Sequence, residues 1–384
     1  MNTINKKNWK KVSFGDYVDH IEETERNPEI RKNAKYVSVD NIESNNLKIQ
    51  SFAKEEMPTF FRKFKKGQIL FSKRNLYLNK VVIADFDGIC SPHIWALETK
   101  AGLIQDLLPF YMLTQSFFNY TNSNAAGTMS KYLGWEEMAL YKMNLPPPPE
   151  QKQIASLFQS IETAMEQVDG QEKNLKALKC DLLNNLIGDS QSFGQIKKDK
   201  WRKIKFSDVV KNSNKVERKP LSVGITKAIG LANINPCDLK IKSFIDIEKE
   251  GTNFSRVFRN GQYLFGARRA YLKQYALADF NGVCTANIMV FDVIDDNIML
   301  RGFIALIIQS DVFINYATGT SVGSLFPNAK WSSLAEFKLK LPELEVQKVI
   351  LQVFDQLETT ITQLKKQKTT LKNLKQKLLN EILG

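Results

Sequence analysis

Two long segments of the chain carry an apolar residue at every seventh position. One pattern starts at Ile154 and the other at Ile350, and each holds for five positions: Ile154, Ile161, Val168, Leu175 and Leu182 in the first, and Ile350, Leu357, Leu364, Leu371 and Leu378 in the second. A seven-residue repeat is typical of a helix that packs along one stripe against another helix. The pattern therefore predicts two long helices, each with one apolar seam.

The positions four residues further along are apolar only near the helix ends. In the middle of each segment they hold polar residues, namely Glu172, Lys179, Lys368 and Lys375. A helix of about 35 residues spans roughly 50 Å, and two such stripes are most simply buried against each other. The alternative is that each helix packs separately on its own neighbouring globular block.

The remaining sequence predicts blocks of short strands and helices. Alternating and apolar runs indicate strands at 35–39, 68–71 and 81–84, and longer apolar stretches indicate helices near 107–118 and 299–308. Prolines at 146–149 and at 342 stand where each block ends and its long helix begins. The predicted fold class is mixed α/β (α+β).

The chain contains two copies of an internal repeat. Trp9 to Asp16 returns as Trp201 to Asp208, 192 positions later, and Gln151-Lys152 returns as Gln347-Lys348, 196 positions later. A shared order of landmarks with small insertions indicates two copies of one unit. The repeat predicts four parts: a first globular domain at 1–148, a helix at 149–190, a second globular domain at 191–342 and a helix at 343–384.

Positive charge gathers in the two globular blocks. The net charge of the 384 residues is +13, with +4 on residues 1–148, −3 on 149–190 and +10 on 191–341. Basic blocks on either side of an acidic stretch fit contact with a polyanion by the blocks and not by the stretch between them. The four cysteines form no C-x-x-C pair, so the sequence indicates neither a zinc site nor a disulfide framework. An apolar membrane span and a signal peptide are not visible either, which predicts a cytoplasmic protein without a membrane partner.

Each block contains a segment of cations, amides and an aromatic ring just after a predicted strand. These segments are 72–80 and 266–274, and their candidate DNA-binding residues are Lys73, Arg74, Asn75, Tyr77 and Lys80 in the first and Arg268, Arg269, Tyr271 and Lys273 in the second. Arginine can pair with guanine, Asn with adenine, and Lys neutralises phosphate. A basic surface turn is the other interpretation.

A second candidate in each block is a Gly-Thr segment. It covers 127–132, which includes Lys131, and 319–324. Small residues there could bring backbone N–H groups close to a phosphate. A purely structural loop remains the alternative.

Patterns of catalytic or metal-binding residues are absent from the sequence. The two histidines, His20 and His93, lack metal-ligand spacing, and neither common phosphate-binding loop occurs. We therefore predict a chain without catalytic residues, metal or cofactor of its own. A nuclease site of Asp, Glu and Lys alone would escape this test, because such residues converge in space rather than in sequence.

The whole chain resembles the specificity subunit of type I restriction-modification systems. The resemblance rests on the repeated segments 9–16 and 201–208, the strands 67–71 and 261–265, and above all on Leu145-Pro-Pro-Pro-Pro-Glu-Gln-Lys-Gln-Ile154 leading into a heptad helix. The second copy of that motif, 341–350, lacks the extra prolines and has Val346 where Glu150 stands. Its turn into the helix is therefore expected to differ.

This resemblance implies two target-recognition domains that each read half of a split site in double-stranded DNA, spaced by an antiparallel coiled coil. Methyltransferase subunits would dock on the helices and bring S-adenosylmethionine, and a restriction subunit that translocates DNA would use ATP and magnesium. Because Lys73-Arg74-Asn75 differs from Ala267-Arg268-Arg269, we expect unequal half-sites. A coiled-coil adaptor without DNA specificity and a self-contained nuclease are the alternatives.

Overall fold

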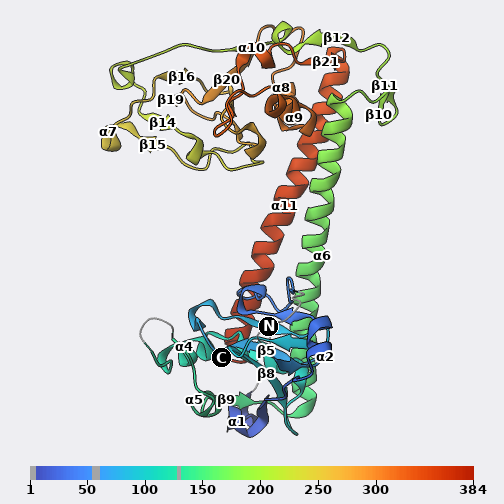
Figure 1. The fold of residues 1–384 in the computed structure, drawn as a ribbon, viewed down its shortest axis with the longest axis vertical. Helices are drawn as coiled ribbons and strands as arrows, with labels where there is room; N and C mark the ends of the chain where they lie inside the picture. The colour runs from blue at the N-terminus through green and yellow to red at the C-terminus, as the bar shows by residue number, and fades with distance from the viewer. Residues whose placement is uncertain (1–5, 54–60, 128–130) are drawn as a thin grey trace. The chain divides into compact units, whose positions relative to one another are not determined.

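The computed structural model describes residues 6–53, 61–127 and 131–384. It divides into two compact units, one made of Met1–Asp169 with Lys365–Gly384 and the other of Gly170–Leu364. Each unit thus contains one globular block and a part of both long helices, which Figure 1 draws in green and red. Among the described residues, no helix has both the length and the apolar character that crossing a membrane requires.

The two long helices, α6 (Pro148–Ile187) and α11 (Leu344–Ile382), run antiparallel within each unit. In the first unit, Glu162 and Asp169 of α6 form ion pairs of 2.5 Å with Lys375 and Lys368 of α11. A step of seven residues toward the C-terminus of α6 therefore corresponds to a step of seven residues toward the N-terminus of α11, which defines an antiparallel register. The second unit has the same register, in which Lys179 pairs with Glu358. The predicted fold, two similar domains joined by an antiparallel helix pair, is confirmed.

The helix seams are apolar except where ion pairs replace the apolar contact. All ten heptad residues are shielded: Ile154, Ile161, Val168, Ile350, Leu364 and Leu378 are buried, and Leu175, Leu182, Leu357 and Leu371 are half-buried. Three of the four polar positions in the middle of the seams, Lys179, Lys368 and Lys375, pair with an acid on the other helix. Charged residues at such positions select one alignment of two helices over others.

The globular part of the first unit is built on three small sheets. β1 (Lys10–Ser13) pairs with β9 (Lys142–Leu145), which brings the start of the block beside the strand that leads into α6. A four-stranded antiparallel sheet has the order β2 (Val18–Ile21), β8 (Ile94–Thr99), β5 (Ile69–Ser72), β6 (Val81–Ile83). A three-stranded sheet has the order β3 (Tyr36–Val37), β7 (Gly88–Cys90), β4 (Arg62–Phe64).

Short helices complete the first unit. They are α1 (Phe14–Tyr17), α2 (Pro28–Asn33), α3 (Leu108–Met112), α4 (Gln115–Ser123) and α5 (Trp135–Ala139), with 3₁₀ turns η1 (Lys6–Asn8), η2 (Val39–Asn41), η3 (Leu76–Leu78) and η4 (Gln105–Leu107). The helix predicted at 107–118 is interrupted. Thr114 has extended backbone and its side chain accepts a hydrogen bond from Phe117 N, which ends α3 and starts α4.

The second unit repeats this arrangement. β12 (Arg202–Lys205) pairs with β21 (Lys338–Leu341), and the large antiparallel sheet has the order β13 (Val210–Asn212), β20 (Ile288–Val293), β17 (Tyr263–Gly266), β18 (Tyr275–Leu277). The other sheet has the order β15 (Ile245–Asp246), β14 (Lys227–Ile229), β19 (Gly282–Cys284), β16 (Arg256–Phe258). A short hairpin, β10 (Ser192–Phe193) with β11 (Ile196–Lys197), follows α6.

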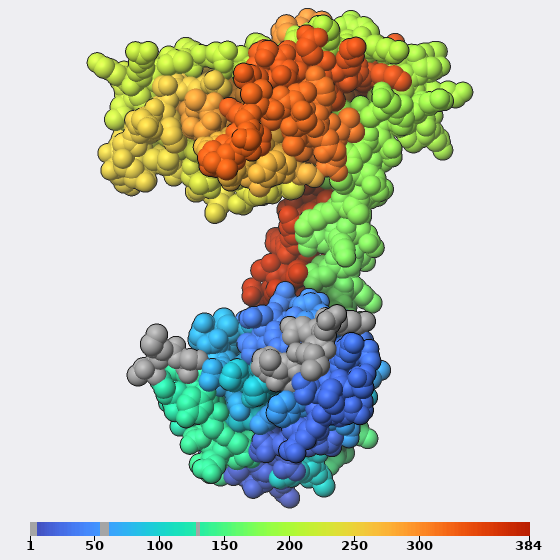
Figure 2. Space-filling model, viewed as in Figure 1, coloured from blue at the N-terminus to red at the C-terminus, as the bar shows by residue number. Residues whose placement is uncertain are grey.

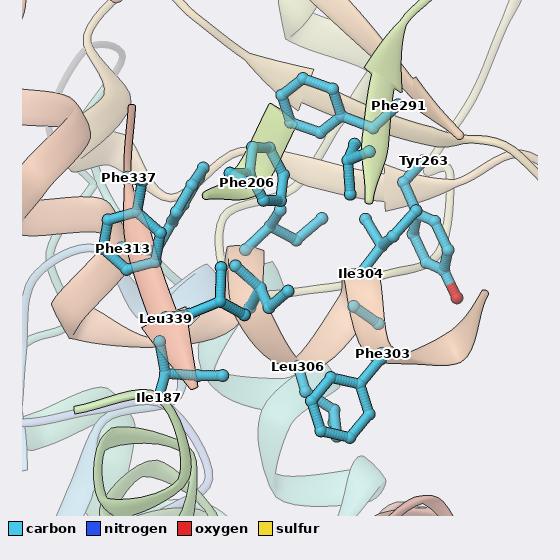
Figure 3. Close-up of a cluster of buried hydrophobic side chains, with 14 of the residues drawn as sticks. Ile187, Phe206, Tyr263, Phe291, Phe303, Ile304, Leu306, Phe313, Phe337 and Leu339 are labelled. Atoms are coloured by element: carbon cyan, nitrogen blue, oxygen red, sulfur yellow. The ribbon is translucent and has the colours of Figure 1, made fainter. Parts of the chain in front are cut away.

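The helices of the second unit enclose an aromatic core. They are α7 (Ile247–Glu250), α8 (Gly302–Gln309), α9 (Asp311–Gly319) and α10 (Trp331–Leu334), with 3₁₀ turns η5 (Phe206–Asp208), η6 (Pro220–Val223), η7 (Leu231–Asn233) and η8 (Ala270–Leu272). Figure 3 shows Phe206, Phe313 and Phe337 gathered near Leu339 of β21 and Ile187 at the end of α6. The same core therefore holds the block to the long helix.

A buried glutamine fixes each long helix to its block. Gln151 is fully buried; its amide donates to the carbonyls of Gly102 (2.7 Å) and Pro146 (2.9 Å) and accepts from Ile104 N. Gln347 makes the equivalent three bonds at the start of α11. These contacts explain why the glutamine occurs in both copies of the motif.

The turn into the helix was expected to differ between the two copies, but α6 starts at Pro148 and α11 at the matching Leu344. What differs is the contact made by the residue before the glutamine. In the first unit the indole N–H of Trp9 donates to Glu150 at 2.9 Å. In the second unit Val346 takes that place and packs against the core that contains Trp201. An apolar contact replaces a polar one at the start of the helix.

Candidate nucleic-acid interface

The β5–β6 loop (Ser72–Lys80) and the β17–β18 loop (Gly266–Gln274) share one backbone conformation. Each contains a 3₁₀ turn, η3 or η8, with a left-handed residue on both sides. The φ values are 52° at Asn75 and 43° at Asn79, against 55° at Arg269 and 52° at Lys273. Non-glycine residues seldom adopt positive φ, so four of them at matched positions mark a specific and repeated turn.

This turn presents an aromatic ring and cations to solvent in both units. Tyr77 is 66% exposed and Tyr271 is 49% exposed, and both lie at the middle of the 3₁₀ turn. Arg74 is exposed, and Arg268 and Arg269 are half-buried. Guanidinium groups donate to phosphates and to base edges, and exposed rings can make apolar contacts in a groove.

The first unit brings its two candidate segments together. A β-bridge joins Arg74 to Tyr132, and a second bridge joins Tyr132 to Ala126. Asn75 N donates to the carbonyl of Lys131, whose side chain is exposed. Of the predicted segment 127–132, residues 128–130 lie outside the described residues.

The second unit brings the corresponding segments together in the same way. Bridges join Arg268 to Asn328 and Asn328 to Val322. We refer to residues 322–328 as the 322–328 hairpin. It extends four residues beyond the predicted segment 319–324, and it includes Phe326 and Asn328, which the sequence reasoning did not select.

Two candidate lysines have partners within their own unit. The Lys80 ammonium donates to the carbonyl of Val39 at 2.7 Å. Lys273 forms a 2.5 Å ion pair with Asp311 at the start of α9. Both hold the loop in place. Of the predicted residues in the two loops, Arg74, Tyr77 and Tyr271 are exposed, and Arg268 and Arg269 are half-buried.

Electrostatics around the first loop reflect its concentrated positive charge. Burial lowers the pKa of Lys73, and the nearby Arg62 lowers it further; the Lys73 ammonium lies 5.4 Å from the centre of the Trp95 ring. Burial also lowers the pKa of His93, with Arg74 and Lys73 adding to the effect. A surface on which neighbouring cations lower one another's pKa favours the binding of an anionic ligand.

Within the described residues, no group of three or more His, Cys, Asp or Glu side chains is placed to hold a metal ion.

The second loop is anchored by a charged pair. The hydrogen bond from Lys273 lowers the pKa of Asp311, so this carboxyl group is held in its charged form. That carboxylate therefore acts as an anchor for the loop.

Comparison with known proteins agrees with this geometry. The family model described as "Type I restriction modification DNA specificity domain" matches residues 6–177 and again 198–373. The EcoDI specificity subunit of Escherichia coli is 26% identical over 47% of this chain, and the alignment spans 40% of that relative. The MjaVIII specificity subunit of Methanocaldococcus jannaschii is 22% identical over 77% of this chain and 73% of its own length.

Solved structures show the same fold. A chain from a study of complex assembly and conformational transition of a type I restriction-modification system has a TM-score of 0.62, with 17% identity over 97% of this chain and 96% of its own. The S subunit from M. genitalium has a TM-score of 0.58, with 13% identity over 99% and 98%.

Two matches of one family model, placed on the two repeated units, together cover most of the sequence. The chain therefore belongs to the type I restriction-modification DNA specificity family.

Proposed function

We propose that this chain reads a bipartite, asymmetric sequence in double-stranded DNA and directs adenine methylation and restriction by partner subunits. Each globular block would read one half-site. S-adenosylmethionine, ATP and magnesium would be held by the methyltransferase and restriction subunits. The predicted cytoplasmic location fits this role.

One observation carries the proposal: both units build the same loop arrangement but place different side chains on it. The turn geometry and the exposed tyrosine are shared, whereas Lys73 and Asn75 in one unit stand where Ala267 and Arg269 stand in the other. A shared frame suits contacts to phosphate and sugar, which are alike in every sequence, and the differing groups suit base edges. Unequal half-sites are the expected result.

The net charges of the blocks, +4 and +10, support binding to DNA phosphates. Two readers joined by a helix pair gain combined affinity when the spacing of the half-sites fits. Neither feature is needed by a coiled-coil adaptor.

The deciding experiment is methylation mapping by long-read sequencing in a host that carries this chain with its methyltransferase subunit, against a host that lacks only this chain. We expect a split motif of modified adenines that depends on the chain. Unchanged methylation, together with no DNA binding by the purified complex, would refute the proposal and favour the adaptor. Cleavage of DNA by the purified chain with magnesium alone would favour a nuclease.

Two matched variants assign the half-sites. Arg74→Ala should weaken or relax one half-site, and Arg268→Ala should affect the other. The same half-site changing in both variants would contradict the assignment of one half-site to each unit.

A further inference from the structure

Phe326 contacts both arginines of the β17–β18 loop. The centre of its ring lies 4.2 Å from Cζ of Arg268 and 4.8 Å from Cζ of Arg269. The ring remains 44% exposed. In Figure 2 the orange segment that includes the 322–328 hairpin lies at the surface of the second unit.

The backbone fixes this aromatic ring relative to the arginines. Arg269 N donates to the carbonyl of Pro327 at 2.8 Å, and Ala329 N donates to the carbonyl of Ala267 at 2.9 Å. The 322–328 hairpin is closed by reciprocal 3.0 Å bonds between Val322 and Asn328. The residues that follow Phe326 are therefore tied to the loop, and the hairpin's own bonds hold Phe326 between its two ends.

The charges gathered here lack internal compensation. Neither Arg268 nor Arg269 takes part in any ion pair found among the described residues. In the same part of the chain, Arg269 Nε and Asn328 Oδ1 are buried without a hydrogen-bond partner. Buried polar groups are seldom left unpaired. Arg269 Nε is therefore a donor that an acceptor atom of a ligand could use, whereas Asn328 Oδ1 could pair only with a donor.

Stacking on Phe326 restricts the orientations that the two guanidinium planes can adopt. An arginine that is already oriented loses less side-chain freedom on binding. A planar, oriented guanidinium suits the O6 and N7 acceptors of guanine in the major groove. In the first unit, the sequence 127–131 between the matching bridge residues Ala126 and Tyr132 contains no aromatic residue, so a ring at the position of Phe326 is particular to the second unit.

We propose that Phe326 is a positioning residue that orients Arg268 and Arg269 to read guanine in the half-site of the second unit. The inference rests on the proposed function and deepens it. It predicts that this half-site contains at least one guanine, at the position that becomes tolerant in Arg268→Ala.

The test is methylation mapping of Phe326→Leu in the complex with the methyltransferase subunit. Leucine keeps an apolar side chain but removes two cation–π contacts, which corresponds to a loss of roughly 5- to 30-fold in discrimination. We expect acceptance of other bases at the guanine position of that half-site and no change in the other half-site. Phe326→Tyr, which keeps a ring, should retain discrimination.

Phe244→Leu is the matched control. Phe244 belongs to the same unit, is 45% exposed and lies 4.6 Å from the ammonium of Lys227, but it stands outside both loops. This variant should leave both half-sites unchanged. Thermal unfolding of the Phe326 and Phe244 variants should be similar, because both rings are partly exposed.

Several results would overturn the inference. It fails if Phe326→Leu keeps the full base preference, if the affected half-site contains no guanine, or if both half-sites weaken together with a fall in the unfolding midpoint. In those cases the wild-type chain would still direct methylation, and the proposed function would stand. Absence of methylation with the wild-type chain would instead refute both.

Discussion

Asn184 of α6 accepts a hydrogen bond from the backbone N–H of Asp311, the first residue of α9, at 2.8 Å. The first unit repeats this contact, since Asn380 of α11 accepts from Gln115 N, at the start of α4, also at 2.8 Å. The N–H groups of a first helical turn lack partners within the helix. Each long helix therefore supplies one acceptor to a helix of the block on which it ends.

Removing either acceptor should destabilise its own unit. We expect Asn184→Ala and Asn380→Ala each to lower the free energy of unfolding by about 0.5–2 kcal/mol, the usual effect of losing a capping side chain. Chemical denaturation of the full chain measures this change. Asn185, next to Asn184, and Asn373, seven positions before Asn380 on α11, are exposed, and their substitution by Ala should have a smaller effect. Equal effects at all four positions would contradict the capping role.

The ion pair between Lys273 and Asp311 should make the stability of the second unit depend on pH. The hydrogen bond from Lys273 lowers the pKa of Asp311, so the stabilisation is present above the ordinary carboxyl pKa of about 4 and is lost as the pH falls through the lowered value. The unfolding midpoint of Asp311→Asn should therefore lie below that of the wild type at pH 7 and approach it in acid. Asp279→Asn, at an exposed residue without an ion pair in the described residues, should show no such convergence.

The sequence predicted the parts of the fold that repeat or alternate. The heptads located both long helices, and the repeat identified two similar blocks. The heptad pattern could not explain the polar residues in the seam. Lys179, Lys368 and Lys375 look like interruptions of the apolar pattern until their acidic partners on the other helix are known. Pairing between segments almost 200 residues apart leaves no mark in local periodicity.

The candidate interface was predicted only in part, because contacts in space decide which charges are available. In the sequence, Lys80 and Lys273 are loop cations like Arg74. In the structure, both lysines bind a partner inside their own unit. Phe326 was missed because it lies beyond the Gly-Thr segment and its role depends on the hairpin that returns it to Arg268. The signal present in the sequence was an apolar pair, Leu325-Phe326, directly before Pro327.

The buried glutamines should be among the most sensitive positions in the chain. Gln151→Met would leave the carbonyls of Gly102 and Pro146 and the N–H of Ile104 without their partner. Because each unpaired buried group costs about 1–3 kcal/mol, we expect a loss of roughly 3 kcal/mol or more in the free energy of unfolding. Gln153→Met, two residues along on the exposed side of α6, should be nearly neutral. A neutral Gln151→Met would mean that water replaces the amide.

Lengthening both long helices should change the spacer and leave the half-sites as they are. One heptad inserted after Gly170 of α6 and another after Lys366 of α11 preserve the ion pairs Glu162–Lys375, Asp169–Lys368 and Lys179–Glu358, because both partners of each pair stay on the same side of the insertions. Seven residues add about 10 Å of helix. Methylation mapping should then show a longer spacer between unchanged half-sites.

A heptad inserted only in α6 is the control for this experiment. It would move Lys179 away from Glu358 or Glu162 away from Lys375, since one register can no longer satisfy both pairs. We expect that variant to unfold more easily and to direct less methylation at any spacing. Two results together would contradict the proposal that the helix pair sets the spacer length: the double insertion keeps the original spacer, and the single insertion remains active. The spacing would then be set by the blocks or by the partner subunits.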